Sequence, residues 1–119
     1  MLITLIIGLP GSGKTELGKS IPCDTFIDDP LFYGDLPDLD GHIIITDPHF
    51  CNKHILHSAK IQLKIKYGDV KFEEIFFEND PIQCKKNAAH RFNKPVEHFI
   101  DYLSGIYNPP RVDMKVWSK

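Results

Sequence analysis

Residues 8–15, Gly-Leu-Pro-Gly-Ser-Gly-Lys-Thr, constrain the fold of this chain more than any other feature. They match the complete pattern Gly-x-x-x-x-Gly-Lys-Thr of a phosphate-binding loop, which joins a buried strand to a helix. The context fits, because a continuous apolar run at 2–7 enters the segment and a helical stretch at 14–20 leaves it. The sequence therefore predicts a strand, a phosphate-binding loop and a helix in that order.

Each residue type in this loop has a physical role in holding phosphate. Glycines allow the backbone to turn successive N–H groups inward as an anion nest, and the helix start adds partial positive charge. The lysine is expected to reach the β- and γ-phosphates of a nucleotide, and the threonine hydroxyl to ligate Mg²⁺. The predicted ATP-binding residues are Gly8, Gly11, Ser12, Gly13, Lys14 and Thr15.

Short apolar runs and helical patterns alternate along the rest of the chain. Further strands are predicted at 25–27, 42–46 and 74–77, with a short last one at 114–117. Asp47-Pro48 and Asp80-Pro81 have the N-cap and first-turn residues of helices, and apolar spacing predicts a helix over 96–107. The expected fold is a single domain over 1–119: a three-layer α/β/α P-loop NTPase fold with a parallel sheet of four or five strands.

Charge and composition narrow the classes of partner. A net charge of −2 and a pI near 6.3 argue against broad coating of duplex nucleic acid, although a local groove for one strand end stays open. The apolar run at 2–7 is too short to span a bilayer and lacks the basic flank of a secretory signal. Three widely spaced cysteines without a Cys-x-x-Cys pair indicate reduced thiols. The chain is therefore expected to be cytoplasmic.

Carboxylates follow the predicted second and third strands. Asp28 and Asp29 come after the second strand and Asp47 after the third, and ligands bind outside the carboxyl ends of strands in open parallel sheets. Asp28 is the predicted general base for an attacking hydroxyl, with Asp29 as the alternative. Asp47 is expected to hold Mg²⁺ through water or to orient the acceptor. The structural alternative is that Asp29 and Asp47, each followed by proline, are simple helix caps.

Taken in order, four motifs resemble a known family. The loop at 8–15, Ile-Asp-Asp ending at Asp29, Ile-Thr-Asp ending at Asp47, and Cys-Lys-Lys-Asn-Ala-Ala-His-Arg ending at Arg91 are similar to the kinase domain of phage polynucleotide 5′-kinases. They are also similar to other small phage P-loop kinases. The resemblance implies that Asp28 activates a 5′-hydroxyl and that Arg91, on a lid, stabilises the transferring phosphoryl group. A planar cation suits that charge, but the basic end of a solvated helix is the alternative.

The sequence departs from this family at one place. The polynucleotide kinases carry an arginine shortly after the Asp-Asp pair that grips the nucleic-acid phosphate, whereas residues 30–33 here read Pro-Leu-Phe-Tyr. Phe32 and Tyr33 could stack a base or pack in the core.

The expected activity is transfer of the ATP γ-phosphoryl group to a hydroxyl acceptor, the first choice being a nucleic-acid 5′-end. A nucleoside, nucleotide or small metabolite is the alternative acceptor. A nucleotide-binding switch without turnover is the alternative class.

Overall fold

A computed structural model describes residues 1–30, 33–89 and 96–118. Its centre is a four-stranded sheet in the order β2-β3-β1-β4, and all three strand pairings are parallel. The strands are β1 (Leu2–Ile7), β2 (Thr25–Asp28), β3 (His42–Thr46) and β4 (Lys71–Phe76). The prediction of an α/β fold on a parallel sheet of four or five strands is confirmed with four.

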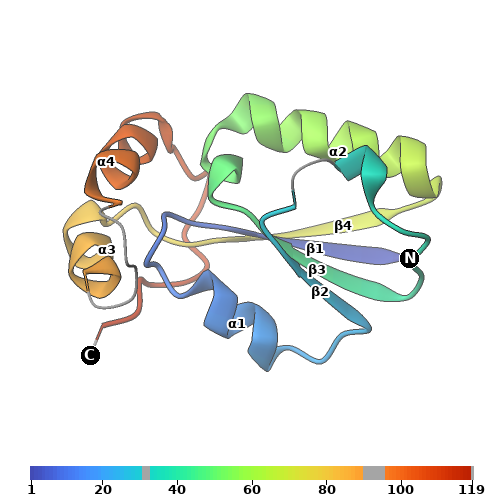
Figure 1. Cartoon of the computed structure of the whole chain (residues 1–119), viewed down its shortest axis with the longest axis horizontal. Helices are drawn as coiled ribbons and strands as arrows, with labels where there is room; N and C mark the ends of the chain where they lie inside the picture. Colours follow the sequence, from blue (N-terminus) through green and yellow to red (C-terminus); the bar gives the residue numbers. More distant parts are fainter. Residues whose placement is uncertain (31–32, 90–95, 119) are drawn as a thin grey trace.

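The helices cover both faces and one end of this sheet. They are α1 (Lys14–Ser20), α2 (Lys53–Tyr67), α3 (Pro81–Ala88) and α4 (Glu97–Ile106). Figure 1 shows α1 on one face of the sheet and α2 on the other, with α3 and α4 beyond the carboxyl ends of the strands. This arrangement is compatible with three α/β/α layers, and it leaves the strand ends facing α3 and α4.

Three elements differ in their bounds from the sequence prediction, and one of them is the strand predicted at 74–77, which is β4 at Lys71–Phe76. The segment after Asp47 begins with a 3₁₀ turn, Pro48–Cys51, and α2 starts only at Lys53, where the Asn52 side chain caps the backbone N–H groups of the first turn. The predicted last strand at 114–117 contributes a single parallel bridge, between Phe77 and Met114.

The core follows from the pattern of the two central strands. Ile3, Leu5 and Ile7 of β1 belong to the larger apolar cluster, and Ile6 and Ile44 to a smaller one that includes Leu17 of α1. Continuous apolar runs are required here because β1 and β3 are buried on both faces.

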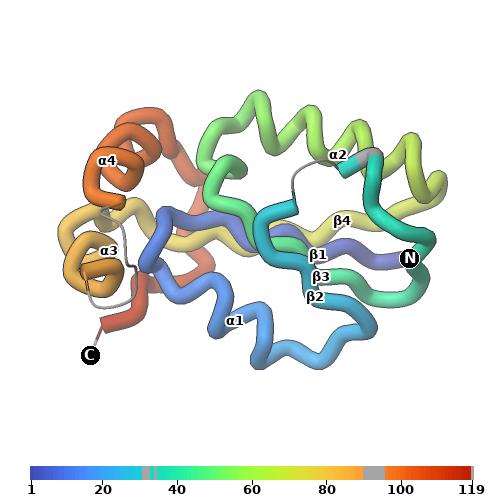
Figure 2. Tube along the Cα trace, in the orientation of Figure 1, coloured from blue at the N-terminus to red at the C-terminus, as the bar shows by residue number. Residues whose placement is uncertain are grey.

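The chain ends lie far apart. Figure 2 shows the N-terminus at the end of the sheet away from α3 and α4, while the C-terminal segment runs back toward α3. Its Trp117 backbone N–H donates to the Ser12 carbonyl, 3.1 Å away, so the last described residues pack against the glycine-rich loop. Among the described residues, no helix has the length and apolarity needed to cross a membrane.

Candidate functional site

The glycine-rich loop takes a backbone path that other residues would resist. Gly11 and Gly13 have φ angles of 85° and 103°, in the left-handed region that glycine adopts without a Cβ penalty. A Cβ on Gly11 would lie 2.5 Å from the Cys84 carbonyl oxygen of α3, and one on Gly8 would lie 2.6 Å from the Ser12 hydroxyl. Glycine is therefore required here both by conformation and by close packing.

Lys14, the first residue of α1, is buried between the loop and the strand ends. Only 7% of the residue is exposed, and its Nζ donates a long hydrogen bond of 3.4 Å to the Leu9 carbonyl oxygen. Among the described residues, no carboxylate lies within 4.0 Å of this ammonium group. Burial lowers its pKa, and this effect is opposed by nearby groups that include Asp28 and Asp47.

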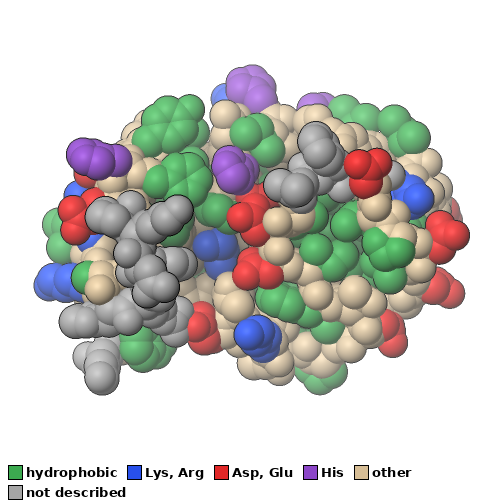
Figure 3. Space-filling view, in the orientation of Figure 1, with side chains coloured by type: hydrophobic (Ala, Val, Ile, Leu, Met, Phe, Trp, Pro, Cys, Tyr) green, Lys and Arg blue, Asp and Glu red, His purple; other side chains and the backbone are tan. Residues whose placement is uncertain are grey.

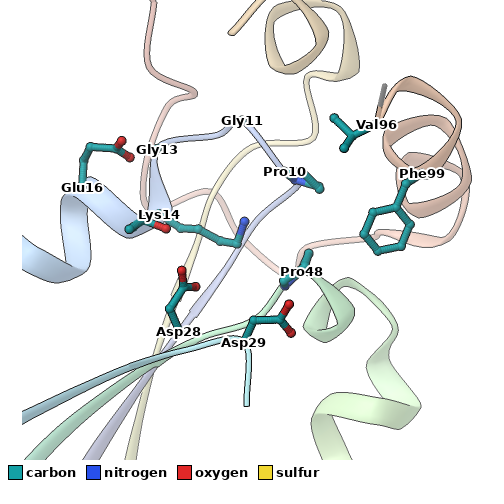
Figure 4. A pocket seen from close by; sticks show the side chains of 11 residues that line it. Pro10, Gly11, Gly13, Lys14, Glu16, Asp28, Asp29, Pro48, Val96 and Phe99 are labelled. Atoms are coloured by element: carbon teal, nitrogen blue, oxygen red, sulfur yellow. The ribbon is translucent and has the colours of Figure 1, made fainter. Parts of the chain in front are cut away.

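Lys14 opens onto a cavity of about 270 Å³ at the carboxyl ends of the strands. In Figure 4 the Lys14 side chain extends into the middle of the cavity, with Asp28 and Asp29 below it and with Pro48 and Phe99 of α4 on the opposite side. Figure 3 shows this face hollowed, with a basic side chain beside acidic ones and histidines nearby. The cavity therefore combines one buried cation, the three carboxylates of Glu16, Asp28 and Asp29, and an apolar wall.

Asp28 is the last residue of β2, and a neighbouring strand orients its side chain. The Thr46 hydroxyl, at the end of β3, donates a 2.6 Å hydrogen bond to Asp28 Oδ1. No described residue is hydrogen-bonded to the other oxygen, Oδ2, and Asp28 lines the cavity with Lys14. The structure therefore brings the predicted base and the predicted phosphate-binding lysine together. Thr46 was not identified from the sequence as a partner of Asp28. The signal that could have identified it is a hydroxyl side chain at the end of an otherwise apolar strand.

Asp29 differs from Asp28 in conformation and surroundings. Its φ of 51° lies in the left-handed region, and its backbone N–H donates to the Thr46 carbonyl oxygen at 2.7 Å. Its carboxylate lies 3.9 Å from His49 Nδ1. Burial raises the pKa of Asp29, and the nearby Asp47 carboxylate raises it further. The two neighbouring acids therefore occupy different electrostatic environments.

Asp47 is almost fully buried, with 3% of the residue exposed, and both of its oxygens have partners. Oδ1 accepts from the His49 backbone N–H at 2.9 Å and also lies 2.9 Å from His49 Nδ1, while Oδ2 accepts from the Tyr33 hydroxyl at 2.5 Å. Tyr33 is itself buried and stacked on Phe50, with ring centroids 5.7 Å apart. Of the two roles considered for Tyr33 in the sequence, the structure shows packing in the core. Asp47 does cap the turn, as its structural alternative required.

One group of side chains has the donors to hold a cation. Asp29, Asp47 and His49 each offer a ligand atom, and these atoms lie within 4.8 Å of one another. Carboxylate oxygens are the ligands that Mg²⁺ prefers, and His49 adds a nitrogen donor beside them, so the Mg²⁺ role of Asp47 stays a prediction. Thr15, the other predicted Mg²⁺ residue, is half-buried and lines the same cavity.

Two sequence predictions concern residues that the structure does not describe. Arg91, the predicted lid cation, and Phe32, the possible stacking residue, fall outside the described residues. On α3, one residue of the basic helix end is engaged in an ion pair: Lys85 Nζ lies 2.6 Å from an Asp101 carboxylate oxygen.

Comparison with known proteins identifies a viral relative. The chain is 33% identical, over 122 aligned positions, to "Uncharacterized protein R277" of Acanthamoeba polyphaga mimivirus, and the match covers 89% of this chain and 86% of that protein. The chain therefore belongs to the same family as R277. No protein-family model matches the chain, and no solved structure does.

Proposed function

We propose that this member of the R277 family is a P-loop kinase, which transfers the γ-phosphoryl group of ATP to a hydroxyl acceptor. The observation that carries the proposal is Lys14: its ammonium is buried beside a glycine-rich loop and has no carboxylate within 4.0 Å among the described residues. A buried charge is costly unless it is paired, so this position favours an anionic ligand. A nucleotide phosphate is the anion that the loop sequence predicts.

Two further features support phosphate binding and a three-layer P-loop fold. The Ser12 hydroxyl is fully buried in the loop and has no hydrogen-bond partner among the described residues, which leaves a polar atom for a ligand-induced rearrangement to satisfy. The sheet order puts β3, which ends just before Asp47, directly beside β1, which enters the loop. The resemblance to the polynucleotide kinases implies a kinase-type P-loop strand order, in which the strand before Asp47 lies beside the strand that enters the loop.

The described residues divide the work of phosphoryl transfer between them. Lys14 would neutralise the β- and γ-phosphate oxygens, and Thr15 and Asp47 would hold Mg²⁺, which supplies further positive charge to those oxygens. Asp28 takes the acceptor's hydroxyl proton as the acceptor oxygen bonds to the γ-phosphorus. The bond from that phosphorus to the β–γ bridging oxygen breaks, and ADP leaves. Arg91 remains the proposed cation for the developing charge on the phosphoryl group.

The acceptor would enter between the carboxylates and the apolar wall. Pro48, Val96 and Phe99 line the cavity together with Asp29, so the acceptor meets apolar surface next to negative charge. A nucleic-acid 5′-end remains the first proposal by resemblance, and a nucleoside or nucleotide is the alternative. If an acceptor ring packs on Phe99, Phe99→Ala raises the acceptor KM about tenfold and leaves the KM for ATP within about twofold. Equal changes in both constants would contradict this placement.

The proposed site of action is the cytoplasm, where ATP is abundant and thiols stay reduced. Cys23, Cys51 and Cys84 are all free in the structure, which agrees with a reducing compartment.

A labelling experiment tests the function. The protein is incubated with γ-labelled ATP, Mg²⁺ and a panel of 5′-hydroxyl oligonucleotides, nucleosides, nucleotides and small hydroxyl metabolites. Lys14→Ala removes the proposed phosphate contact, and Lys19→Ala, an exposed lysine in the last turn of the same helix, is the matched control. Label on one acceptor class that disappears in Lys14→Ala and persists in Lys19→Ala establishes the kinase. Failure of the wild-type protein to bind ATP refutes the proposal.

Asp28→Asn separates the kinase from a nucleotide-binding switch. The variant retains the shape of the side chain, so ATP affinity should stay within about twofold while turnover falls by a factor of at least 100. The switch would be favoured if the wild type binds ATP without labelling any acceptor and if Asp28→Asn does not differ from the wild type in ATP affinity or in turnover.

A further inference from the structure

The side-chain amide of Asn87 joins three segments that are distant in sequence. Its Nδ2 donates to the Gly11 carbonyl oxygen at 2.9 Å and to the Trp117 carbonyl oxygen at 2.6 Å. Its Oδ1 accepts from Gln83 Nε2 at 2.9 Å, one turn earlier on α3. Asn87 is 7% exposed, so the polar side chain is buried with its hydrogen bonds made. A primary amide has two N–H donors, and both are used here.

The partners also fix which way the amide faces. Both atoms near Nδ2 are carbonyl oxygens, which only accept, whereas Gln83 approaches Oδ1 with an N–H group. Rotating the amide by 180° would place oxygen against oxygen and nitrogen against nitrogen. The two backbone carbonyls therefore hold the amide in the orientation in which Asn87 serves the loop, and Gln83 adds a third hydrogen bond at Oδ1.

These hydrogen bonds hold the outer side of the glycine-rich loop. The Gly11 carbonyl accepts from the Asn87 side chain, and the Ser12 carbonyl accepts from the Trp117 backbone N–H. Asn87 also donates to the Trp117 carbonyl, so it holds both the loop and the segment that binds the loop. In a trans peptide the C=O and N–H groups point in opposite directions, so holding the Ser12 carbonyl against the C-terminal segment turns the Gly13 N–H to the other side. An anion nest needs N–H groups on its inner side and carbonyls on its outer side.

We propose that Asn87 is a positioning residue that preorganises the phosphate-binding loop from behind. It clamps the loop to α3 and to the C-terminal segment. Gly11 is held with positive φ in close contact with α3. A glycine without such restraints would sample many other backbone conformations. Ordering the loop before the ligand arrives removes an entropic cost from binding. The inference rests on the proposed function for the identity of the ligand, but the clamp itself is a property of the free protein.

The chain contains a matched control for this clamp. Asn79 Nδ2 donates to two carbonyl oxygens, those of Ser104 at 2.9 Å and Tyr107 at 3.0 Å, and its Oδ1 accepts from the Ser104 hydroxyl at 2.8 Å. Asn79 thus has the same donor and acceptor pattern, but its partners lie at the end of α4 and not in the loop. Changing either asparagine to aspartate keeps the shape and replaces two donors with an acceptor.

The test compares Asn87→Asp with Asn79→Asp by hydrogen exchange and by calorimetric titration with ATP and Mg²⁺. Both variants should lose thermal stability, but only Asn87→Asp should exchange faster over residues 9–14 and raise the Kd for ATP about tenfold or more. The milder Gln83→Met, which removes the hydrogen bond to Asn87 Oδ1 and so loosens the amide, should shift both readouts in the same direction. If Asn87→Asp does not fold, Gln83→Met tests the positioning role in its place.

Equal loop exchange in Asn87→Asp and Asn79→Asp, or unchanged exchange in Gln83→Met, would overturn the inference. The two proposals fail separately. If the wild-type protein does not bind ATP, the proposed function fails, while the exchange of residues 9–14 still decides whether Asn87 orders the loop. If wild type binds ATP and Asn87→Asp binds it equally well, the positioning role fails and the function stands.

Discussion

Tyr33→Phe tests how much the structure depends on the buried hydrogen bond to Asp47. The substitution removes only the hydroxyl, which donates to Asp47 Oδ2 at 2.5 Å, and keeps the ring that stacks on Phe50. A hydrogen bond to a charged acceptor contributes about 1.5 to 3 kcal/mol net, and the oxygen left behind is buried without this donor. In a domain of 119 residues each kcal/mol shifts Tm by about 4 °C. Tm should therefore fall by about 6 to 12 °C.

The matched control is Tyr67→Phe. The Tyr67 hydroxyl donates to the Pro37 carbonyl oxygen at 2.8 Å, but this contact is exposed and its acceptor is neutral. Its loss should lower Tm by about 4 °C or less, because water replaces the missing partner. Thermal unfolding followed by circular dichroism measures both variants at neutral pH. If Tyr33→Phe costs no more than Tyr67→Phe, the reasoning that ties Asp47 to this buried donor is refuted.

Two further predictions concern ionisation. Asp113→Asn removes a carboxylate whose pKa is lowered by hydrogen bonds from a backbone N–H and then a guanidinium. The stabilisation from this carboxylate is present at neutral pH and is lost as pH falls through its lowered pKa. Asp113→Asn should therefore have a lower Tm than wild type at pH 7, and the difference should disappear as the carboxylate becomes protonated in acid. Asp69→Asn, at an exposed aspartate, is the matched control for the change of side chain. Burial raises the pKa of Cys51 and Cys84 to about 12, so alkylation at pH 8 followed by peptide mass spectrometry should label the half-buried Cys23 first; equal labelling of all three would contradict their burial.

Local sequence signals determined most of the elements. The apolar runs of β1 and β3, the Asp80-Pro81 start of α3 and the periodic apolar face of α4 each depend on residues close together in the chain, so they could be predicted without knowledge of the rest. The same holds for the glycine-rich loop, where Gly11 and Gly13 adopt the left-handed backbone conformation that favours glycine over other residues. The end of the sheet at which Asp28 and Asp47 would meet followed from parallel strand order.

Tertiary packing decided how those side chains are held. Asp28 takes its orientation from Thr46 on the next strand, and Asp47 from Tyr33, which is 14 positions earlier in the chain. Asn87 reaches Gly11 across 76 positions, although nothing in its local sequence indicates that its amide binds the loop. Such contacts depend on strand order and on how α3 and the C-terminal segment dock, which no local pattern encodes. The sequence by itself therefore determined which groups gather at the strand ends, and only the tertiary structure decided which hydrogen bonds orient them.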